Sequence, residues 1–188
     1  LLSPLESKPG SFASAAPRLR LPQFAPIVDK IRDYQWLAVQ QLFRCSGFVV
    51  SPCGSGKTLI GCLIAALNGG RSLVLTTRFT EQWKHALETF FVSMHSDVYI
   101  MVADNTELCF KKGFPTIVLS TYSSFSTNNE RTRALKQLIY DTVILDEAHT
   151  AAAKTHLQLI DKLHCVWACG LTATKVREDG ELEKLESR

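Results

Sequence analysis

The residues best suited to chemistry in this sequence form the stretch 51–58, Ser-Pro-Cys-Gly-Ser-Gly-Lys-Thr. A β-branched apolar run precedes it and an apolar run of helical character follows it, which is the order of a phosphate-binding P-loop. Gly54 and Gly56 would let backbone N–H groups approach phosphate oxygens, and the start of the next helix would add free N–H groups. Lys57 would bind the β- and γ-phosphates, and Thr58 would offer its hydroxyl to Mg²⁺.

A second chemical cluster lies in 143–149, Val-Ile-Leu-Asp-Glu-Ala-His. An apolar strand that ends in two adjacent acids is costly unless those acids are paired or functional. Asp146 could hold Mg²⁺ through water, facing Thr58, and Glu147 could deprotonate a water that attacks the γ-phosphate. Alone, each signal has a plainer interpretation: a glycine loop capping a helix, or solvated or ion-paired acids at a strand end. Together, at a domain-scale separation, they predict a nucleoside triphosphate site.

The elements that must position these residues alternate along the chain. Most predicted strands are continuous apolar runs, which indicates a mainly parallel sheet buried on both faces by helices, a three-layer α/β fold. The run 123–129 is polar and predicts a loop. The predicted strands are 47–50, 72–76, 97–102, 116–120, 142–145 and 165–169, and the predicted helices are about 34–43, 59–67, 80–91, a charged helix ending at 135–139, and 154–163.

Polar residues follow most of these strands, at the carboxyl ends where ligands bind in such sheets. Besides the P-loop, these clusters are Thr76-Thr77-Arg78, Ser120-Thr121-Tyr122, Asp146-Glu147 and Thr172-Ala173-Thr174. Five polar clusters on one edge of one sheet predict a functional face there. Trp83 and Trp167 lie in apolar periodic runs and are predicted to be core residues.

Several of these segments resemble the motifs of a superfamily 2 helicase, and more narrowly those of the xeroderma pigmentosum group B (XPB) family. Ser51 departs from the usual first P-loop residue, and Ala148 stands where many XPB proteins carry Val. Since Ala148 completes a literal DEAH box, a DEAH-type RNA helicase is an alternative, against which the Arg-Glu-Asp and Glu-Gln-Trp runs argue. The segments that carry the resemblance are Ile31-Arg-Asp-Tyr-Gln35, the P-loop, Glu81-Gln-Trp83, Ser120-Thr-Tyr-Ser123, Asp146-Glu-Ala-His149, Thr172-Ala-Thr174 and Arg177-Glu-Asp179.

The resemblance implies sites for ATP and Mg²⁺ and a RecA-like fold. Gln35 would contact adenine, with Arg32 near the base or the phosphates; from the residues alone, Gln35 is more simply a solvated helix residue. The implied ATP-binding residues are Arg32, Gln35, Pro52, Cys53, Gly54, Ser55, Gly56, Lys57 and Thr58; the implied metal ligands are Thr58 and Asp146; and the implied catalytic residues are Lys57, Asp146 and Glu147.

The resemblance also implies contacts beyond the nucleotide. Thr77, Arg78 and Thr121 would touch the DNA backbone without sequence preference, although capping of turns is the simpler interpretation of these three. The residues implied to couple the nucleotide to DNA and to a second domain are His149, Thr172, Ala173, Thr174, Arg177, Glu178 and Asp179.

Composition is that of an ordinary globular protein, with 46% hydrophobic and 21% charged residues among 188. The net charge of +3 is a small excess that simply helps solubility, and it does not itself indicate a nucleic-acid partner. The six cysteines form no C-x-x-C pair, so we expect a reduced intracellular protein without structural zinc. No apolar run approaches the ~18 residues of a membrane span, and no membrane partner is expected.

Two segments are expected. Residues 1–30, rich in Pro, Ser and Ala, predict a linker or strap, and 31–188 predict the first RecA-like helicase domain. The resemblance implies the ATP-binding half of a nuclear DNA-dependent ATPase and 3′–5′ DNA helicase of nucleotide excision repair and transcription initiation, in a complex like general transcription factor IIH. A second RecA-like domain, expected to lie in the parent chain and not in this sequence, would supply an arginine worth ~10³–10⁵ in rate, so these residues alone should be nearly inactive. A truncated scaffold module and a translocase that does not separate strands are the alternatives.

Overall fold

The elements of the fold follow one another as strand and helix along nearly the whole described chain. The computed structural model describes residues 31–77, 80–92, 99–102, 116–151, 160 and 162–173. Its elements are α2 (Asp33–Leu42), β1 (Gly47–Val50), α3 (Lys57–Asn68), β2 (Ser72–Thr76), α4 (Thr80–Val92), β3 (Tyr99–Val102), β4 (Thr116–Thr121), α5 (Tyr122–Ser126), α6 (Glu130–Lys136), β5 (Ile139–Asp146), α7 (Ala148–Ala151) and β6 (His164–Thr172).

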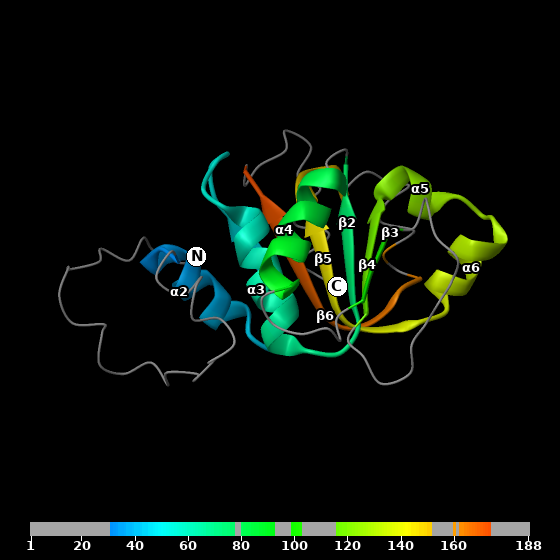
Figure 1. Cartoon of the computed structure of the whole chain (residues 1–188), viewed down its shortest axis with the longest axis horizontal. Helices are drawn as coiled ribbons and strands as arrows, with labels where there is room; N and C mark the ends of the chain where they lie inside the picture. The colour runs from blue at the N-terminus through cyan, green and yellow to red at the C-terminus, as the bar shows by residue number, and fades with distance from the viewer. Residues whose placement is uncertain are drawn as a thin grey trace.

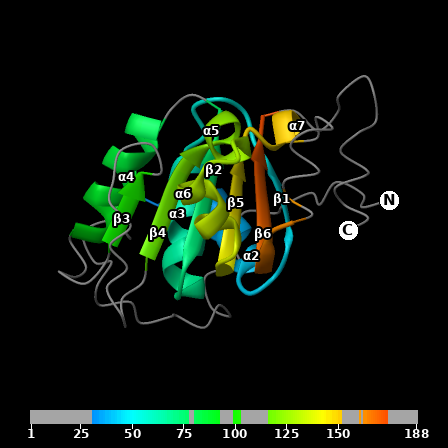
Figure 2. The same cartoon turned by 90° about the vertical axis from the view of Figure 1, so that its right-hand side faces the viewer.

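The strands form one sheet of six, in the order β1-β6-β5-β2-β4-β3, and every described pair is parallel. The register aligns the carboxyl ends: Val50 lies opposite Thr172, and Thr76 lies opposite Thr121. Figure 2 shows the strands side by side, with the labels α5 and α7 at the same end. The predicted parallel sheet is therefore confirmed, and the described parts of the predicted polar clusters lie at one edge of it; a function of that edge stays a prediction.

Two hydrophobic clusters cover the two faces of the sheet, because successive strand residues point to opposite sides. Val74 and Ile144 pack with α2, α3 and α4, whereas Leu73, Leu75 and Val143 pack with α5, α6 and α7. Figure 1 shows α2, α3 and α4 on one side of the strands and α5 and α6 on the other. This is the predicted three-layer arrangement, in which the described strand ends are anchored in two buried hydrophobic clusters.

The segment 122–139 differs from the prediction. The polar run expected as a loop contains the short helix α5, because Thr121 caps it by accepting a hydrogen bond from Ser124 N and because Tyr122 and Phe125 are buried. The following helix ends at Lys136, earlier than expected. Ile139 begins β5 instead, pairs with β6 and is 66% exposed.

Other corrections concern exposure. In α2, Val39 and Leu42 are buried as predicted, but Tyr34 and Leu37 face solvent. Trp167 is only half-buried, so its assignment to the core is wrong. Strand β6 is also longer than predicted, since both β5 and β1 pair with it. The predicted helix 154–163 and the strap 1–30 lie mostly or wholly outside the described residues. None of the helices in the described ranges is both long and apolar enough for a membrane span.

Candidate functional site

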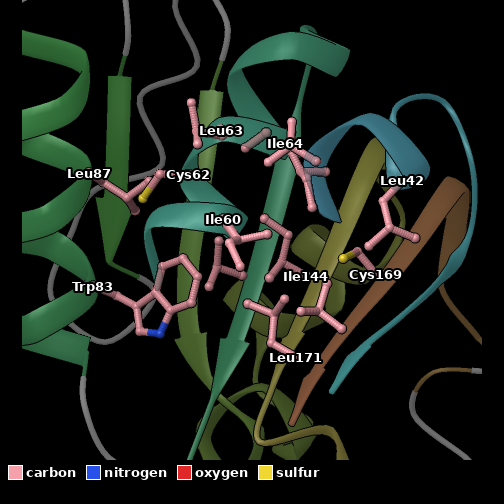
Figure 3. Close-up of a cluster of buried hydrophobic side chains, with 14 of the residues drawn as sticks. Leu42, Ile60, Cys62, Leu63, Ile64, Trp83, Leu87, Ile144, Cys169 and Leu171 are labelled. Carbon is pink, nitrogen blue, oxygen red and sulfur yellow. The ribbon is translucent and has the colours of Figure 1, made fainter. Parts of the chain in front are cut away.

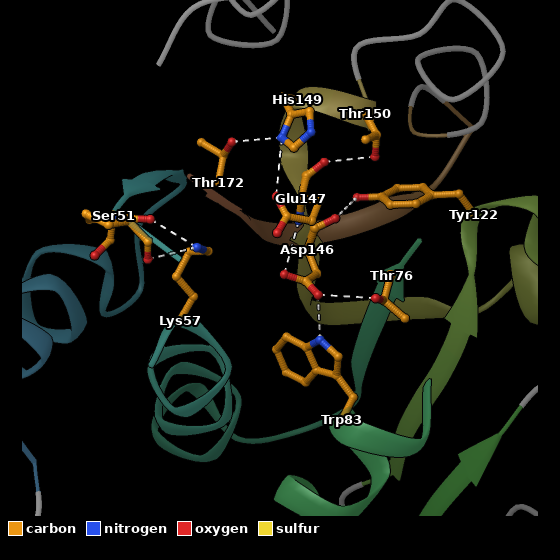
Figure 4. A network of polar contacts seen from close by, with 11 residues as sticks. Ser51, Lys57, Thr76, Trp83, Tyr122, Asp146, Glu147, His149, Thr150 and Thr172 are labelled. Atoms are coloured by element: carbon orange, nitrogen blue, oxygen red, sulfur yellow. Dashed lines mark hydrogen bonds and ion pairs between the residues drawn. The ribbon is translucent and has the colours of Figure 1, made fainter. Parts of the chain in front are cut away.

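The loop between β1 and α3 has the backbone of a phosphate-binding turn. Gly54 and Gly56 have φ angles of 76° and 83°, in the region that glycine adopts most readily. Gly56 is the N-cap of α3, so the free N–H groups of the first helical turn open toward the loop. Lys57 is 8% exposed, and its ammonium group donates to the carbonyls of Ser51 (3.0 Å) and Pro52 (3.2 Å). These bonds hold the loop closed over the lysine, as Figure 4 shows.

Helix α2 anchors this loop through Gln35. The side chain is 4% exposed; its Nε2 donates to Ser55 O (2.8 Å), and its Oε1 accepts from Arg32 N (3.0 Å). Tyr34 donates to the same carbonyl of Ser55 (2.6 Å), and the Arg32 guanidinium donates to the Tyr34 hydroxyl (3.2 Å). Gln35 is therefore not the solvated helix residue that its position alone suggests. It joins α2 to the apex of the loop and keeps one further donor and acceptor position.

Asp146, at the end of β5, is held by hydrogen bonds to both carboxylate oxygens. Oδ2 accepts from Thr76 Oγ1 (3.2 Å) and from the indole Nε1 of Trp83 (2.7 Å), and Oδ1 accepts from Glu147 N (3.1 Å). The residue is 8% exposed, and a carboxylate buried to this degree needs such partners. Figure 4 shows the indole nitrogen aimed at the carboxylate from below.

Glu147 turns the chain from β5 into α7. Its φ of 50° is unusual for a residue other than glycine, and strained backbone of this kind clusters at functional sites. Its carbonyl accepts from both the backbone N–H and the hydroxyl of Thr150. His149 Nδ1 lies 3.3 Å from Glu147 Oε2 and 3.1 Å from Thr172 Oγ1. The histidine thus joins the acidic box on β5 to the end of β6.

Tyr122 closes the site from the α5 side. Its hydroxyl donates to the backbone carbonyl of Asp146 (3.0 Å). Burial, followed by the nearby charges of Asp146 and Glu147, raises the pKa of Tyr122 well above its usual value. The phenol therefore stays neutral and remains a donor to the acidic box at physiological pH.

The residues present fit a magnesium nucleotide. The Ser55 hydroxyl is buried and makes no hydrogen bond within the described part of the chain, so it has a free donor beside the free N–H groups of α3. Thr58 lies in the first turn of α3 and is half-buried. A hydroxyl and a carboxylate suit Mg²⁺, a cation usually held by one or two carboxylates plus phosphates and water.

The other expected site residues are only partly described. Thr77 and Thr121 are half-buried and lie at the ends of the adjacent strands β2 and β4. The Thr121 hydroxyl caps α5, which is the simpler interpretation given above, and its contact with DNA stays a prediction. Ala173 follows β6 and is half-buried. Arg78, Thr174, Arg177, Glu178 and Asp179 lie outside the described residues.

The hydrogen bonds that Thr76, Trp83 and Tyr122 make to Asp146 were not predicted from the sequence, although Thr76 and Tyr122 stand in its predicted polar clusters. Trp83 is the buried core residue that its periodicity predicts, at 1% exposed, but its polar nitrogen also bonds Asp146. A signal was available, because a buried indole usually finds a partner for its N–H and a buried tyrosine for its hydroxyl.

Comparisons with known proteins agree with this geometry. Residues 29–177 match the family described as Type III restriction enzyme, res subunit. The chain is 31% identical, over 82% of its length, to the general transcription and DNA repair factor IIH helicase/translocase subunit XPB of Encephalitozoon cuniculi. It is 30% identical, over 80%, to the DNA 3′-5′ helicase XPB of Mycobacterium tuberculosis. It spans 25% and 28% of these relatives, about a quarter of their length.

A solved structure shows the same fold at low identity. The SWI2/SNF2 ATPase core of Sulfolobus solfataricus, determined in complex with double-stranded DNA, superimposes with a TM-score of 0.62 at 17% identity, over 80% of this chain and 33% of that one. The RecA-like fold is thereby confirmed. The family match and the XPB relatives likewise confirm the resemblance to a superfamily 2 motor domain, and the chain belongs to the family of the Type III restriction enzyme res subunit.

Proposed function

We propose that this chain is the ATP-binding half of an XPB-like, DNA-dependent ATPase and 3′–5′ DNA helicase. The observation that carries the proposal is the meeting of the P-loop and the acidic box at one edge of a parallel sheet, with Asp146 held by Thr76, Trp83 and Glu147. A structural ion pair at a strand end would not need a lysine-bearing glycine loop beside it. The Arg-Glu-Asp run and the XPB relatives support the narrower assignment.

In this proposal each residue has a defined task. Lys57 exchanges its bonds with the Ser51 and Pro52 carbonyls for phosphate oxygens, and Ser55 and the first N–H groups of α3 complete the phosphate site. Asp146 and Thr58 would hold Mg²⁺, which neutralises phosphate charge when bound. Glu147 accepts the proton of the attacking water, and its contact with His149 links that carboxylate to Thr172. Gln35 would contact adenine while its side chain donates a hydrogen bond to the carbonyl of Ser55 in the P-loop.

The proposed contacts with DNA, with a second domain and with a larger complex follow from the resemblance and from the relatives' names. Thr77, Arg78 and Thr121 would contact the phosphate backbone of DNA, and Arg177, Glu178 and Asp179 would couple the site to a second RecA-like domain of the parent chain. Residues 1–30 would act as a strap and 31–188 as the first motor domain. The relative from Encephalitozoon cuniculi is named as a subunit of general transcription and DNA repair factor IIH, which supports a nuclear role in repair and transcription within a similar complex.

The first test is nucleotide binding by the 188-residue chain. Lys57→Ala should weaken binding of magnesium mant-ATP at least tenfold, because the ammonium group that neutralises phosphate charge is lost. Fluorescence titration measures the affinity. Lys84→Ala is the matched control, since Lys84 lies on the surface of α4 with only a 4.0 Å contact to Glu88. Equal affinities of wild type and Lys57→Ala would overturn the nucleotide site.

The half-motor part has its own test. A second domain supplies an arginine worth ~10³–10⁵ in rate, so these residues alone should hydrolyse ATP very slowly with or without DNA. Robust DNA-stimulated hydrolysis by the 188-residue chain, lost in Lys57→Ala, would refute this part.

Because the Encephalitozoon cuniculi relative is named a helicase/translocase, a second candidate is a translocase that moves along DNA without separating its strands. A strand-displacement assay on the parent protein, compared with its rate of ATP hydrolysis, separates the two activities. A truncated scaffold without turnover is tested by the same measurements, since it would show neither.

A further inference from the structure

The indole nitrogen of Trp83 makes the shortest of the hydrogen bonds to the Asp146 carboxylate described above, at 2.7 Å. A core tryptophan needs only its ring to fill space, and Figure 3 shows this ring packed between α4 and α3 near Ile60. The ring reaches the end of β5 because Gly61 in α3 has no side chain. An added Cβ there would lie 2.6 Å from the Trp83 ring. Helix packing therefore delivers an N–H donor to the acidic box.

The two oxygens of Asp146 are used unequally. A carboxylate oxygen accepts about two hydrogen bonds, and Oδ2 already accepts two, from Thr76 and Trp83. Oδ1 accepts one, from Glu147 N, and retains capacity. The two donors thus fix the rotation of the carboxylate and leave Oδ1 as the oxygen available to a cation or its water.

We infer that Trp83, with Thr76 as its partner, is a positioning residue that presents Asp146 Oδ1 for Mg²⁺. The inference rests on the proposed function, in which Asp146 holds the metal. Partners that orient a metal-binding carboxylate typically change metal affinity 10–100-fold when removed. Helix α4, which follows Thr77 and Arg78 in the chain, is in this way tied directly to the acidic box.

The test uses Trp83→Phe in the 188-residue chain, which keeps an aromatic ring but removes the donor. Binding of mant-ADP is titrated in EDTA and across a series of Mg²⁺ concentrations. We expect the Mg²⁺ midpoint to rise 10–100-fold, while the affinity for mant-ADP without metal changes less than about twofold. Tyr140→Phe is the matched control, because it also removes a buried donor, to Leu135 O at 2.9 Å, on the other face of the sheet.

A second readout follows the metal instead of the nucleotide. Mn²⁺ replaces Mg²⁺, and its electron paramagnetic resonance spectrum with ADP and protein, compared with the spectrum with ADP alone, reports the ion that the protein holds. Thr76→Val, which removes the other donor to Oδ2, should shift the Mg²⁺ midpoint in the same direction and serves if Trp83→Phe does not fold.

The outcomes separate the inference from the proposed function. If wild type shows no binding of mant-ADP with or without metal, the proposed function fails, and the inference fails with it. If wild type binds with a clear Mg²⁺ dependence that folded Trp83→Phe or Thr76→Val shares unchanged, only the inference is overturned. Equal losses in EDTA and in Mg²⁺ would also overturn it, because they would show a general structural role.

Discussion

Gly54 and Gly56 have the same left-handed backbone but different surroundings. A Cβ on Gly54 would meet nothing within 4 Å, whereas one on Gly56 would lie 2.3 Å from Gln35 Nε2. Gly54 is therefore needed for its left-handed backbone. Gly56 is needed for its left-handed backbone and also for the space that lets Gln35 reach the carbonyl of Ser55.

We predict that Gly56→Ala destabilises the chain more than Gly54→Ala. Each should lose ~1–2 kcal/mol for the left-handed backbone, and Gly56→Ala a further ~1 kcal/mol because it displaces the hydrogen bond from Gln35 to Ser55. Urea denaturation measures both free energies of unfolding. Adding Gln35→Ala should remove most of the difference, since no side chain is then displaced. Equal losses in the two single variants would contradict the assigned contact.

The charged residues of the site could be predicted from the sequence, whereas the hydrogen bonds that orient them could not. Lys57, Asp146 and Glu147 stand in recognisable runs, and the structure places them at the start of α3, at the end of β5 and in the turn after it. The bond from Trp83 to Asp146 joins residues 63 positions apart, and no local pattern encodes it. The bond from Gln35 to Ser55 was similarly hidden, because the two residues belong to different elements.

At the scale of elements, strands were predicted where both faces are buried and missed where pairing alone extends them. β2 is an apolar run with every residue buried, so its bounds agree with the prediction. The first residues of β6 are exposed, and their membership of the strand depends on pairing with β5. Helix α5 has five residues, too few for a helical period, and its cap and two buried aromatic rings define it instead.

Gly61 sets the approach of α4 to α3. An ideal Cβ would lie 2.6 Å and 3.3 Å from atoms of the Trp83 ring and 3.1 Å from a methyl group of Leu171. We predict that Gly61→Ala destabilises the chain by ~1–2 kcal/mol, because overpacking of 1–3 kcal/mol exceeds the gain of up to ~1 kcal/mol from helix propensity. Chemical denaturation checks this. A more stable variant, as expected at an exposed helical glycine, would show that α3 and α4 leave enough space for the added methyl group.

At the scale of the whole molecule, both faces of the sheet bury groups that ionise only at high pH. Burial raises the pKa of Cys62, on α3, and of Cys169, on β6, from 9.0 to about 12 each. Burial raises the pKa of Tyr140, on the opposite face, from 10.0.

These shifts predict an alkaline loss of stability. The folded chain keeps the protons of Cys62 and Cys169 up to about pH 12, whereas the unfolded chain releases them above pH 9.0, so the free energy of unfolding falls as pH rises through this window. Together the two thiols should contribute about 3 kcal/mol of loss by pH 10. Urea denaturation at pH 8, 9 and 10 measures the slope. In Cys62→Ala/Cys169→Ala the unfolded chain has neither thiol to ionise, so most of the slope should vanish while the smaller share of the tyrosines remains. An unchanged slope in this double variant would mean that the two thiols do not set the alkaline limit.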